Sequence, residues 1–249
     1  NKNNYEEIID NYKPNYIWCK KEYLSKLKID LISVYNFNEY HLFEYNKKKI
    51  LTHKELLLLC TSSGSTGSQK FIKQSLKNIK SNTKSIIKYQ NLKSDDSSIT
   101  TLPLSYTFGM SCINTLLTVG AKMIISNNSI LQKEFWAEYK KHKITIINGV
   151  PFTYNVLDKL RFFSKPNNIK IFTQAGGKLS DELQIKISDF CKKNNSKFFV
   201  MYGQAEATTR ISYLPNNYSL KKIGSVGIPI DGGQIKIRND KLKIIKKKN

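Results

Sequence analysis

Short apolar runs alternate along this chain with longer stretches in which apolar residues recur every three or four positions. Short apolar runs between turn signals are typical of buried strands, and the longer periodic stretches are typical of helices. Their alternation favours an α/β fold with parallel-rich sheets in several layers, flanked by helices. The predicted strands span residues 16–18, 56–60, 99–102, 122–126, 144–147, 170–173 and 197–201. The predicted helices span residues 5–12, about 72–89, 132–142, 152–163 and 180–194.

The last predicted helix has a clear N-terminal signal. Further along the chain, the residue pattern changes from long periodic stretches to short apolar pieces. Ser180 is a suitable N-cap, and the acidic Asp181 and Glu182 complement the positive end of the helix dipole. After Arg210, short apolar pieces are separated by Asn, Gly and Pro. This pattern predicts a small β-rich C-terminal part.

The segment at residues 61–70 combines six hydroxyl side chains with two glycines and a lysine. Glycine lets the backbone turn tightly and bring its N–H groups close to an anion, and Lys70 adds a positive charge. These groups suit a polyphosphate, although their spacing differs from the Walker pattern. A flexible Ser/Gly linker is the alternative, but the position between a buried strand and a predicted helix favours the phosphate site. The candidates are Ser62, Ser63, Gly64, Ser65, Thr66, Gly67 and Lys70.

Two further loops follow predicted strands directly. In open α/β sheets, ligands bind beyond the carboxyl ends of the strands, so these loops and residues 61–70 together predict a nucleotide site. Each of these residues also has an alternative interpretation without a ligand. Gly176 and Gly177 could form a simple turn, Tyr202 could be a core residue, and Glu206 could be a surface charge. The loop residues are Gly176 and Gly177 after the strand at 170–173, and Tyr202, Gly203, Gln204 and Glu206 after the strand at 197–201.

Length and composition limit the classes of function. With 249 residues, 40% of them hydrophobic, the chain is globular and large enough for one large domain or two small ones. No apolar run approaches the roughly 20 residues that span a bilayer, and no signal peptide is visible. The four cysteines are scattered, which fits reduced thiols in a cytoplasmic protein better than disulfides or a zinc site.

The net charge of +22 raises the alternative of nucleic-acid binding. Only Arg161, Arg210 and Arg238 are arginines, so few side chains suit bidentate recognition of base edges. The lysines are spread along the whole chain among Asn and Ile, and their one cluster lies in the tail. We interpret the charge as a compositional bias and expect no nucleic-acid partner.

Several segments resemble, in the same order, core motifs of the adenylate-forming (AMP-binding) superfamily, which includes acyl-CoA synthetases and peptide-synthetase adenylation domains. The similarity extends from about residue 5 to residue 233. It implies the large N-terminal domain of such an enzyme over residues 1–235, followed by a truncated basic tail over 236–249, with the lid domain absent. The motifs lie at residues 61–70, 102–109, 149–154, 202–206 and 224–229.

The resemblance implies ATP-dependent activation of a small carboxylic acid to an acyl-adenylate. The acyl group then passes to the thiol of coenzyme A or phosphopantetheine, the latter on a carrier protein. An anion that attacks a polyphosphate needs cations nearby, which Mg²⁺ and lysines supply. By similarity, Lys70 and Glu206 are catalytic, Glu206 binds Mg²⁺, and residues 62–67 with Lys70 bind phosphates.

The resemblance also assigns the adenine and acyl contacts. Tyr202 would stack on adenine within its motif with Gly203 and Gln204, while Gly176 and Gly177 would let the backbone approach the base. The implied acyl-pocket residues are Tyr106, Phe108, Gly109, Val150, Pro151 and Tyr154.

The chain departs from the family pattern at two motif positions. Gln69 stands where proline is usual, and Ala205 stands where threonine is usual before the glutamate. A lost hydrogen bond to a charged group costs about 1.5–3 kcal/mol, and Thr208 is a candidate to replace the missing hydroxyl. Since the ribose-binding motif and the lid lysine have no counterpart here, we expect these residues to bind nucleotide weakly and not to complete the reaction alone.

Gly109 bears on the substrate. Amino-acid-activating relatives carry an aspartate at this position, and a buried ammonium without a partner is costly. We therefore expect a fatty, aryl or sugar-linked acid and a ligase similar to acyl-CoA synthetases. The alternatives are a module that loads an amino or aryl acid onto a carrier protein, and an inactive relic or basic nucleic-acid-binding module.

Overall fold

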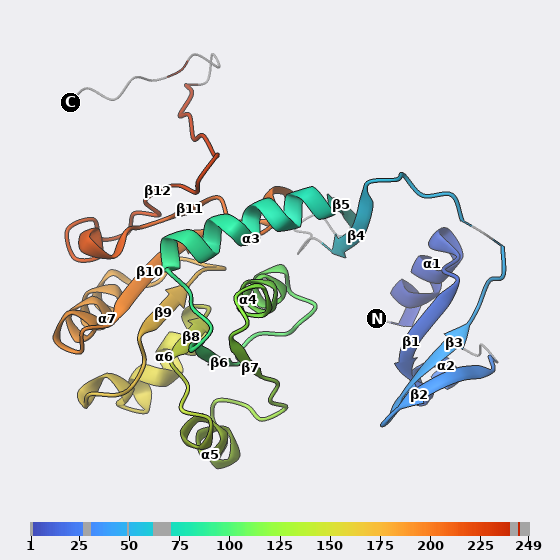
Figure 1. Cartoon of the computed structure of the whole chain (residues 1–249), viewed down its shortest axis with the longest axis horizontal. Coiled ribbons are helices and arrows are strands. Elements are labelled where there is room, and N and C mark those ends of the chain that lie inside the picture. The colour runs from blue at the N-terminus through green and yellow to red at the C-terminus, as the bar shows by residue number, and fades with distance from the viewer. Residues whose placement is uncertain (1, 27–30, 49, 62–70, 240–243, 245–249) are drawn as a thin grey trace. The chain divides into compact units, whose positions relative to one another are not determined.

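The computed structural model describes residues 2–26, 31–48, 50–61, 71–239 and 244. The chain divides into two compact units, residues 1–54 and residues 55–249, which are coloured blue and cyan to red in Figure 1. The domain boundary predicted at residue 235 stays a prediction. No helix among the described residues is long and apolar enough to cross a membrane.

The first unit is a small antiparallel sheet with two helices. Its elements are α1 (Lys2–Tyr12), β1 (Tyr16–Lys20), α2 (Lys21–Lys26), β2 (Ser33–Phe37) and β3 (Tyr40–Glu44). The strand order is β1-β3-β2. Ile9, Leu24 and Phe43 are buried, while Trp18 stacks with Tyr35 and Tyr40 on exposed positions of the strands. The predicted helix at 5–12 and the strand at 16–18 are confirmed.

The second unit contains a hairpin and a seven-stranded sheet. The hairpin pairs β4 (Leu56–Thr61) with β5 (Phe71–Ser75) in antiparallel fashion. The sheet has the order β12-β11-β10-β9-β8-β6-β7, in which the five strands from β7 to β10 are parallel. Its strands are β6 (Ser97–Ile99), β7 (Lys122–Ile124), β8 (Ile146–Gly149), β9 (Ile171–Gln174), β10 (Lys197–Tyr202), β11 (Ser212–Tyr213) and β12 (Ile228–Pro229).

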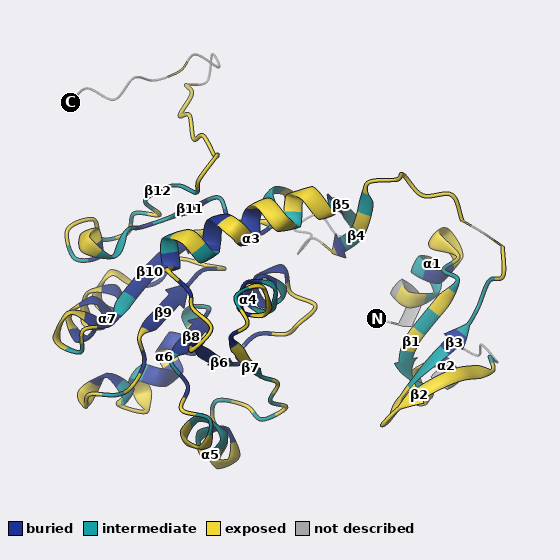
Figure 2. Cartoon of the chain, viewed as in Figure 1, coloured by how far each residue is buried: buried dark blue, intermediate teal, exposed yellow. Residues whose placement is uncertain are grey.

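Helices cover both faces of this sheet, so the α/β class is confirmed. One apolar core packs α5 (Lys133–Lys141), α6 (Pro151–Lys159) and α7 (Asp181–Lys193) against one face. A second core packs α4 (Thr107–Thr118), together with partly buried residues of α3 (Leu76–Gln90), against the other. Consecutive strand residues alternate between the two cores, so β8 and β9 are buried throughout, as the dark blue strands of Figure 2 show. The described residues also form three short 3₁₀ turns: Phe162–Ser164, Ala205–Ala207 and Asn216–Tyr218.

The helix predicted from about residue 72 begins later than expected. Residues 72–75 belong to β5, because Ile72 pairs with Cys60 on β4. The helix starts only after Ser75, whose hydroxyl accepts a hydrogen bond from the Asn78 backbone N–H in a capping box. The described residue that follows the candidate phosphate segment, Phe71, therefore begins a strand and not a helix, and Thr61 before that segment belongs to β4 of the hairpin.

Other boundaries moved by a few residues, and two helices, α2 and α4, are not among the predicted ones. The strand predicted at 99–102 is β6, at Ser97–Ile99, where Ser98 Oγ donates to the Ile146 carbonyl. The strand predicted at 144–147 extends to Gly149 through its pairing with β9. Helix α4 was not predicted because its Thr, Ser, Cys and Gly residues have weak helix propensity. Burial of Phe108, Cys112 and Leu116 against the sheet stabilises it.

Candidate functional site

A cavity of about 980 Å³ lies at the carboxyl ends of β9 and β10. The turns that follow these two neighbouring strands both line it, as expected for an open α/β sheet. Thr61, the last residue of β4, also lines it, so the end of the hairpin reaches the same cavity. The predicted site residues that line it are Tyr106, Phe108, Gly176, Gly177, Tyr202, Gly203, Gln204 and Glu206.

The remaining predicted residues fall into two groups. Ser62, Ser63, Gly64, Ser65, Thr66, Gly67 and Lys70 lie outside the described residues. Gly109, Val150, Pro151 and Tyr154 are described but are not among the residues that line the cavity.

The turn after β9 is stabilised by its immediate neighbours. Gln174, the last residue of the strand, is buried and donates from Nε2 to the Gly177 carbonyl at 2.8 Å. Gly176 has a φ of +82°, which favours glycine, and an added Cβ would lie 2.8 Å from the Tyr106 hydroxyl. A Cβ on Gly177 would lie 3.2 Å from Pro151 Cγ. The glycine pair thus lets the backbone pass close to Tyr106 and Pro151.

The turn after β10 is more strongly bent. An added Cβ on Gly203 would collide with the Thr209 carbonyl, so only glycine fits there. Thr208 and Thr209 both have positive φ, +58° and +95°, which is rare for β-branched residues. The Glu206 side chain is exposed on the 3₁₀ turn between them and Gly203. The chain therefore makes a compact, strained turn that presents this carboxylate at the cavity.

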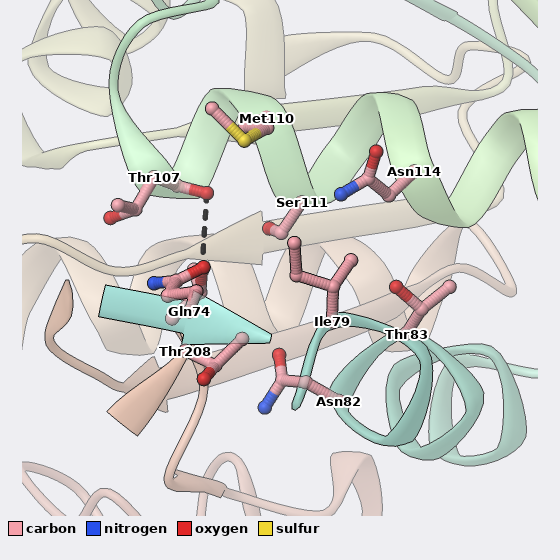
Figure 3. A pocket seen from close by; sticks show the side chains of 10 residues that line it. Gln74, Ile79, Asn82, Thr83, Thr107, Met110, Ser111, Asn114 and Thr208 are labelled. Atoms are coloured by element: carbon pink, nitrogen blue, oxygen red, sulfur yellow. Dashed lines mark hydrogen bonds between the residues drawn. The ribbon is translucent and has the colours of Figure 1, made fainter. Parts of the chain in front are cut away.

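Thr208 does not face the large cavity. It lines a small polar pocket between β5, α3 and α4, with room for about one water molecule (Figure 3). Thr209 lines both spaces, but its hydroxyl donates to the Thr107 carbonyl at 3.2 Å. The structure therefore gives no support to Thr208 as a replacement for the hydroxyl that Ala205 lacks.

Arg210 closes this turn on the interior side and was not singled out as a site residue. It is 2% exposed, and its guanidinium lies 4.3 Å from the centre of the Phe108 ring. It donates to the hydroxyls of Ser111 at 3.0 Å and Tyr89 at 3.2 Å. No carboxylate among the described residues pairs with it, and its Nε lacks a partner there. Sequence alone gave no sign that this cation is buried.

Gly109 and Tyr154 have structural roles. A Cβ on Gly109 would collide with the Pro103 carbonyl, so packing is sufficient to explain the glycine. Tyr154 is fully buried in the core under the sheet, where its hydroxyl donates to the Thr173 carbonyl at 2.7 Å. Its side chain is thus engaged behind the strands rather than at the cavity.

The cavity has few ionisable groups. Glu206 is the one carboxylate among its described lining residues, beside the cations Lys178 and Arg210. Burial raises the pKa of the nearby Cys112 thiol to about 11, so this cysteine is protonated at neutral pH and is not a nucleophile. Within the described part of the chain, no group of three or more His, Cys, Asp or Glu could hold a metal. The two cations Lys178 and Arg210 on the cavity lining suit binding of an anionic ligand.

The chain belongs to the AMP-binding enzyme family, whose model matches residues 8–249. It is 25% identical over 199 residues to a 2-succinylbenzoate–CoA ligase of Bacillus pumilus, which covers 78% of this chain and 39% of that protein. It is 24% identical over 179 residues to a feruloyl-CoA synthase of Amycolatopsis, which covers 70% of this chain and 35% of that protein. The chain thus spans well under half the length of these relatives.

Solved structures show the same fold. O-succinylbenzoate coenzyme A synthetase from Bacillus subtilis in complex with AMP matches with a TM-score of 0.75 and 19% identity, over 99% of this chain and 50% of that chain. The N-terminal domain of FACL13 from Mycobacterium tuberculosis matches with a TM-score of 0.68 and 17% identity, over 80% of this chain and 50% of that one. The predicted family and the predicted large-domain fold are therefore confirmed.

Proposed function

We propose that this chain carries the nucleotide-binding and acid-binding part of an ATP-dependent acid–thiol ligase. The observation that supports it best is the single cavity lined by the turn at Gly176, the turn at Tyr202–Glu206 and the end of β4 at Thr61. These three segments are separate in sequence, and two of them, the end of β4 and the turn at Tyr202–Glu206, lie in segments that resemble motifs of one family. A cavity that combines a glycine turn, an exposed aromatic ring and a carboxylate suits a nucleotide with its metal ion.

Each lining residue has a proposed role. Tyr202 is 46% exposed, so a face of its ring is available to stack on adenine, next to Gly203 and Gln204. Gly176 and Gly177 leave space for the base to approach the backbone. Tyr106 and Phe108 form an aromatic wall for the acyl group, with their ring centres 6.4 Å apart. Val150 and Pro151 lie against the glycine turn. The acyl-pocket roles of Gly109 and Tyr154 rest on the family resemblance alone.

The carboxylate of Glu206 fits a magnesium ion. Mg²⁺ in nucleotide sites takes one or two protein carboxylates and completes its shell with phosphate oxygens and water. A lone, exposed carboxylate beside a large cavity meets that requirement. When bound there, the ion would neutralise phosphate charge. Lys70 and residues 62–67 would contribute further donors to the phosphates, a role that rests on the family resemblance.

The proposed reaction has two steps. A carboxylate oxygen of the acid bonds to the α-phosphorus of ATP, and the bond from that phosphorus to the bridging oxygen breaks, which releases pyrophosphate. The thiol sulfur then bonds to the acyl carbon, loses its proton and displaces AMP. Coenzyme A is the favoured thiol because the curated relatives are named as CoA ligases, and carrier-bound phosphopantetheine is the alternative.

The proposed substrate is an apolar carboxylic acid, with aryl acids favoured by the aromatic wall at Tyr106 and Phe108. An α-amino acid is disfavoured because the described lining offers its ammonium no carboxylate other than Glu206. A cytoplasmic location is proposed as well, since all four cysteines are free thiols.

The first test is calorimetric titration of the 249-residue chain with ATP, with Mg²⁺ and with EDTA. Glu206→Gln removes the metal-binding charge, and we expect at least about a tenfold loss of affinity with Mg²⁺ and little change with EDTA. Glu134→Gln, which changes an exposed carboxylate on α5, is the matched control and should bind as the parent does. Equal affinities for all three proteins with Mg²⁺ would remove Glu206 from its proposed role.

The second test measures pyrophosphate release with a panel of aryl, fatty and amino acids, in a protein extended beyond both ends of these 249 residues. Release that depends on one class of acid identifies the substrate. ATP binding without release for any acid would favour a nucleotide-binding relic. A salt-dependent shift with oligonucleotides but no ATP binding would favour the nucleic-acid alternative.

A further inference from the structure

The turn from Gly203 to Arg210 needs support from outside itself. Its two consecutive threonines with positive φ are strained, and strained backbone persists only where the surrounding structure holds it. Inside the turn, the N–H groups of Ala207 and Thr209 donate to the Gln204 carbonyl, and that of Thr208 donates to the Ala205 carbonyl. The Ile211 N–H also donates to the Tyr202 carbonyl at 2.9 Å, so the pairing of β10 with β11 closes the base of the turn. Side chains from outside the turn hold the segment between these strands.

Two buried side-chain amides from distant elements bind the two ends of the turn. Gln74 on β5 is 4% exposed and donates from Nε2 to the Ala205 carbonyl at 3.1 Å, across 131 positions of sequence. Asn82 on α3 is 7% exposed and donates from Nδ2 to the Arg210 carbonyl at 2.9 Å, across 128 positions. Figure 3 shows both amides beside Thr208, with Gln74 on the strand and Asn82 on the helix.

The bond from Gln74 also connects the turn to the hairpin. Gln74 pairs with Leu58 on β4, whose last residue, Thr61, lines the large cavity together with Glu206. The Gln74 amide could have remained at the exposed edge of a two-stranded hairpin, where water would satisfy it. Instead it is buried, and it donates to the carbonyl of the residue directly before Glu206. This hydrogen bond therefore fixes the position of the Glu206 backbone relative to the β4–β5 hairpin.

We propose that Gln74 and Asn82 are positioning residues that hold the Glu206 carboxylate at the rim of the cavity. Neither residue needs to touch a ligand. Gln74 sets the distance between Glu206 and the end of β4, and Asn82 holds the far end of the strained turn. This proposal rests on the proposed role of Glu206 in binding the magnesium ion of ATP.

The test compares Gln74→Met with Gln184→Met in the 249-residue chain. Gln184 is an equally buried glutamine on α7 that binds the backbone of Ser219 and Gly224, away from the Glu206 turn. Methionine keeps the length of both side chains but removes the amide. Urea unfolding measures the global cost of each change, so that effects on the turn can be separated from effects on stability.

The first readout needs no ligand. Amide hydrogen exchange at Ala207, Thr208 and Thr209 should rise by about tenfold in Gln74→Met, because one hydrogen bond less holds the turn closed. Gln184→Met should leave these three amides unchanged. If the exchange is the same in both variants, the positioning role is refuted, whatever the protein binds. Should Gln74→Met not fold, Asn82→Leu provides the same measurement from the other end of the turn.

The second readout is the affinity for ATP with Mg²⁺ and with EDTA. Gln74→Met should weaken binding by about tenfold with Mg²⁺ and hardly at all with EDTA. In the Glu206→Gln background, Gln74→Met should cause no further loss, because both changes act through one carboxylate. Losses that multiply would overturn the proposal. A parent chain that binds no ATP contradicts the proposed function, while the exchange measurement still decides whether Gln74 orders the turn.

Discussion

The turn at residues 174–177 and the turn at residues 203–210 follow neighbouring parallel strands and line one cavity, but different parts of the chain stabilise them. The first is held by Gln174, a residue three positions from the carbonyl that it binds. The second is held by Gln74, Asn82 and the Thr107 carbonyl, all about a hundred positions or more away in sequence. The side-chain bond that holds the first turn is therefore local, although the Ala175 N–H also donates to the Gly149 carbonyl on β8. The pairing of β10 with β11 closes the base of the second turn, and its side-chain bonds link it to the hairpin, α3 and α4.

This difference has a consequence for the proposed site. A turn whose side-chain bonds are local needs few distant contacts to keep its shape. That property suits a turn that only leaves space for the base of a nucleotide. A turn held from several elements moves only if those elements move, which suits a carboxylate whose position matters to within a fraction of an ångström. The strain at Thr208 and Thr209 lies in the second turn, where distant contacts are available to hold it.

The largest expected effect is that of Gly203→Ala. The new Cβ would meet the Thr209 carbonyl, and backbone atoms cannot move aside as a flexible side chain can. We expect a loss of more than about 3 kcal/mol in urea unfolding, with collapse of the second turn. Gly232→Ala is the control, because Gly232 also has positive φ, +79°, but no atom within 4 Å of the added Cβ, and should cost only about 1–2 kcal/mol. Similar losses in the two variants would mean that the close approach at Gly203 does not matter.

The next effect tests the first turn. Gly176→Ala combines positive φ with a contact of 2.8 Å to the Tyr106 hydroxyl, and we expect a loss of about 2–3 kcal/mol. Tyr106→Phe removes the hydroxyl and should recover the part of this loss that comes from the contact, but not the part that comes from φ. A double-mutant cycle in urea measures the recovery. An interaction energy near zero would show that the hydroxyl is not what excludes a side chain at residue 176.

A smaller effect is expected from Gln174→Met. It removes the hydrogen bond to the Gly177 carbonyl and should cost about 1 kcal/mol. Faster amide exchange should be confined to residues 175–178, with none at residues 207–209, whereas Gln74→Met should give the opposite pattern. If Gln174→Met also loosens the second turn, the two turns are coupled and the contrast between them fails.

The smallest effect concerns an ion pair between Lys88 on α3 and Asp231, which follows the second turn in sequence. The distance between Lys88 Nζ and Asp231 Oδ2 is 2.8 Å. Lys88 lowers the pKa of the Asp231 carboxyl, so the folded state binds its proton less readily than the unfolded state does. The pair therefore contributes at pH values above the ordinary carboxyl pKa, and its contribution is lost as the pH falls through the lowered pKa. The difference in melting temperature between the parent and Lys88→Met should be small at neutral pH and should vanish as the pH falls through the lowered pKa of the Asp231 carboxyl. Both side chains are exposed, so salt should also reduce it. A difference that grows on acidification contradicts this assignment.

Sequence analysis predicted the elements whose signals are local. The strands β9 and β10 appear as apolar runs because both faces of the parallel sheet are buried. Ser180 was predicted as an N-cap, and its hydroxyl accepts a hydrogen bond from the Leu183 N–H. The family motifs also located the turns that line the cavity.

Other elements lack such local signals. Strand β5 continues smoothly into a helical pattern, and only its pairing with β4 makes it a strand. Helix α4 has poor intrinsic propensity and forms because Phe108, Cys112 and Leu116 are buried against the sheet. The burial of Arg210 was equally invisible, since a single arginine in a sequence is most often exposed.

Local signals therefore predict the α/β class, the order of most elements and the family, because hydrophobic period, capping residues and short motifs act over a few neighbouring positions. The hydrogen bonds from Gln74 and Asn82 to the Glu206 turn, and the close packing around Gly109 and Tyr154, emerge only from the folded arrangement. The physical reason is that a hydrogen bond across 131 positions exists only after the intervening chain has folded, so no local pattern records it.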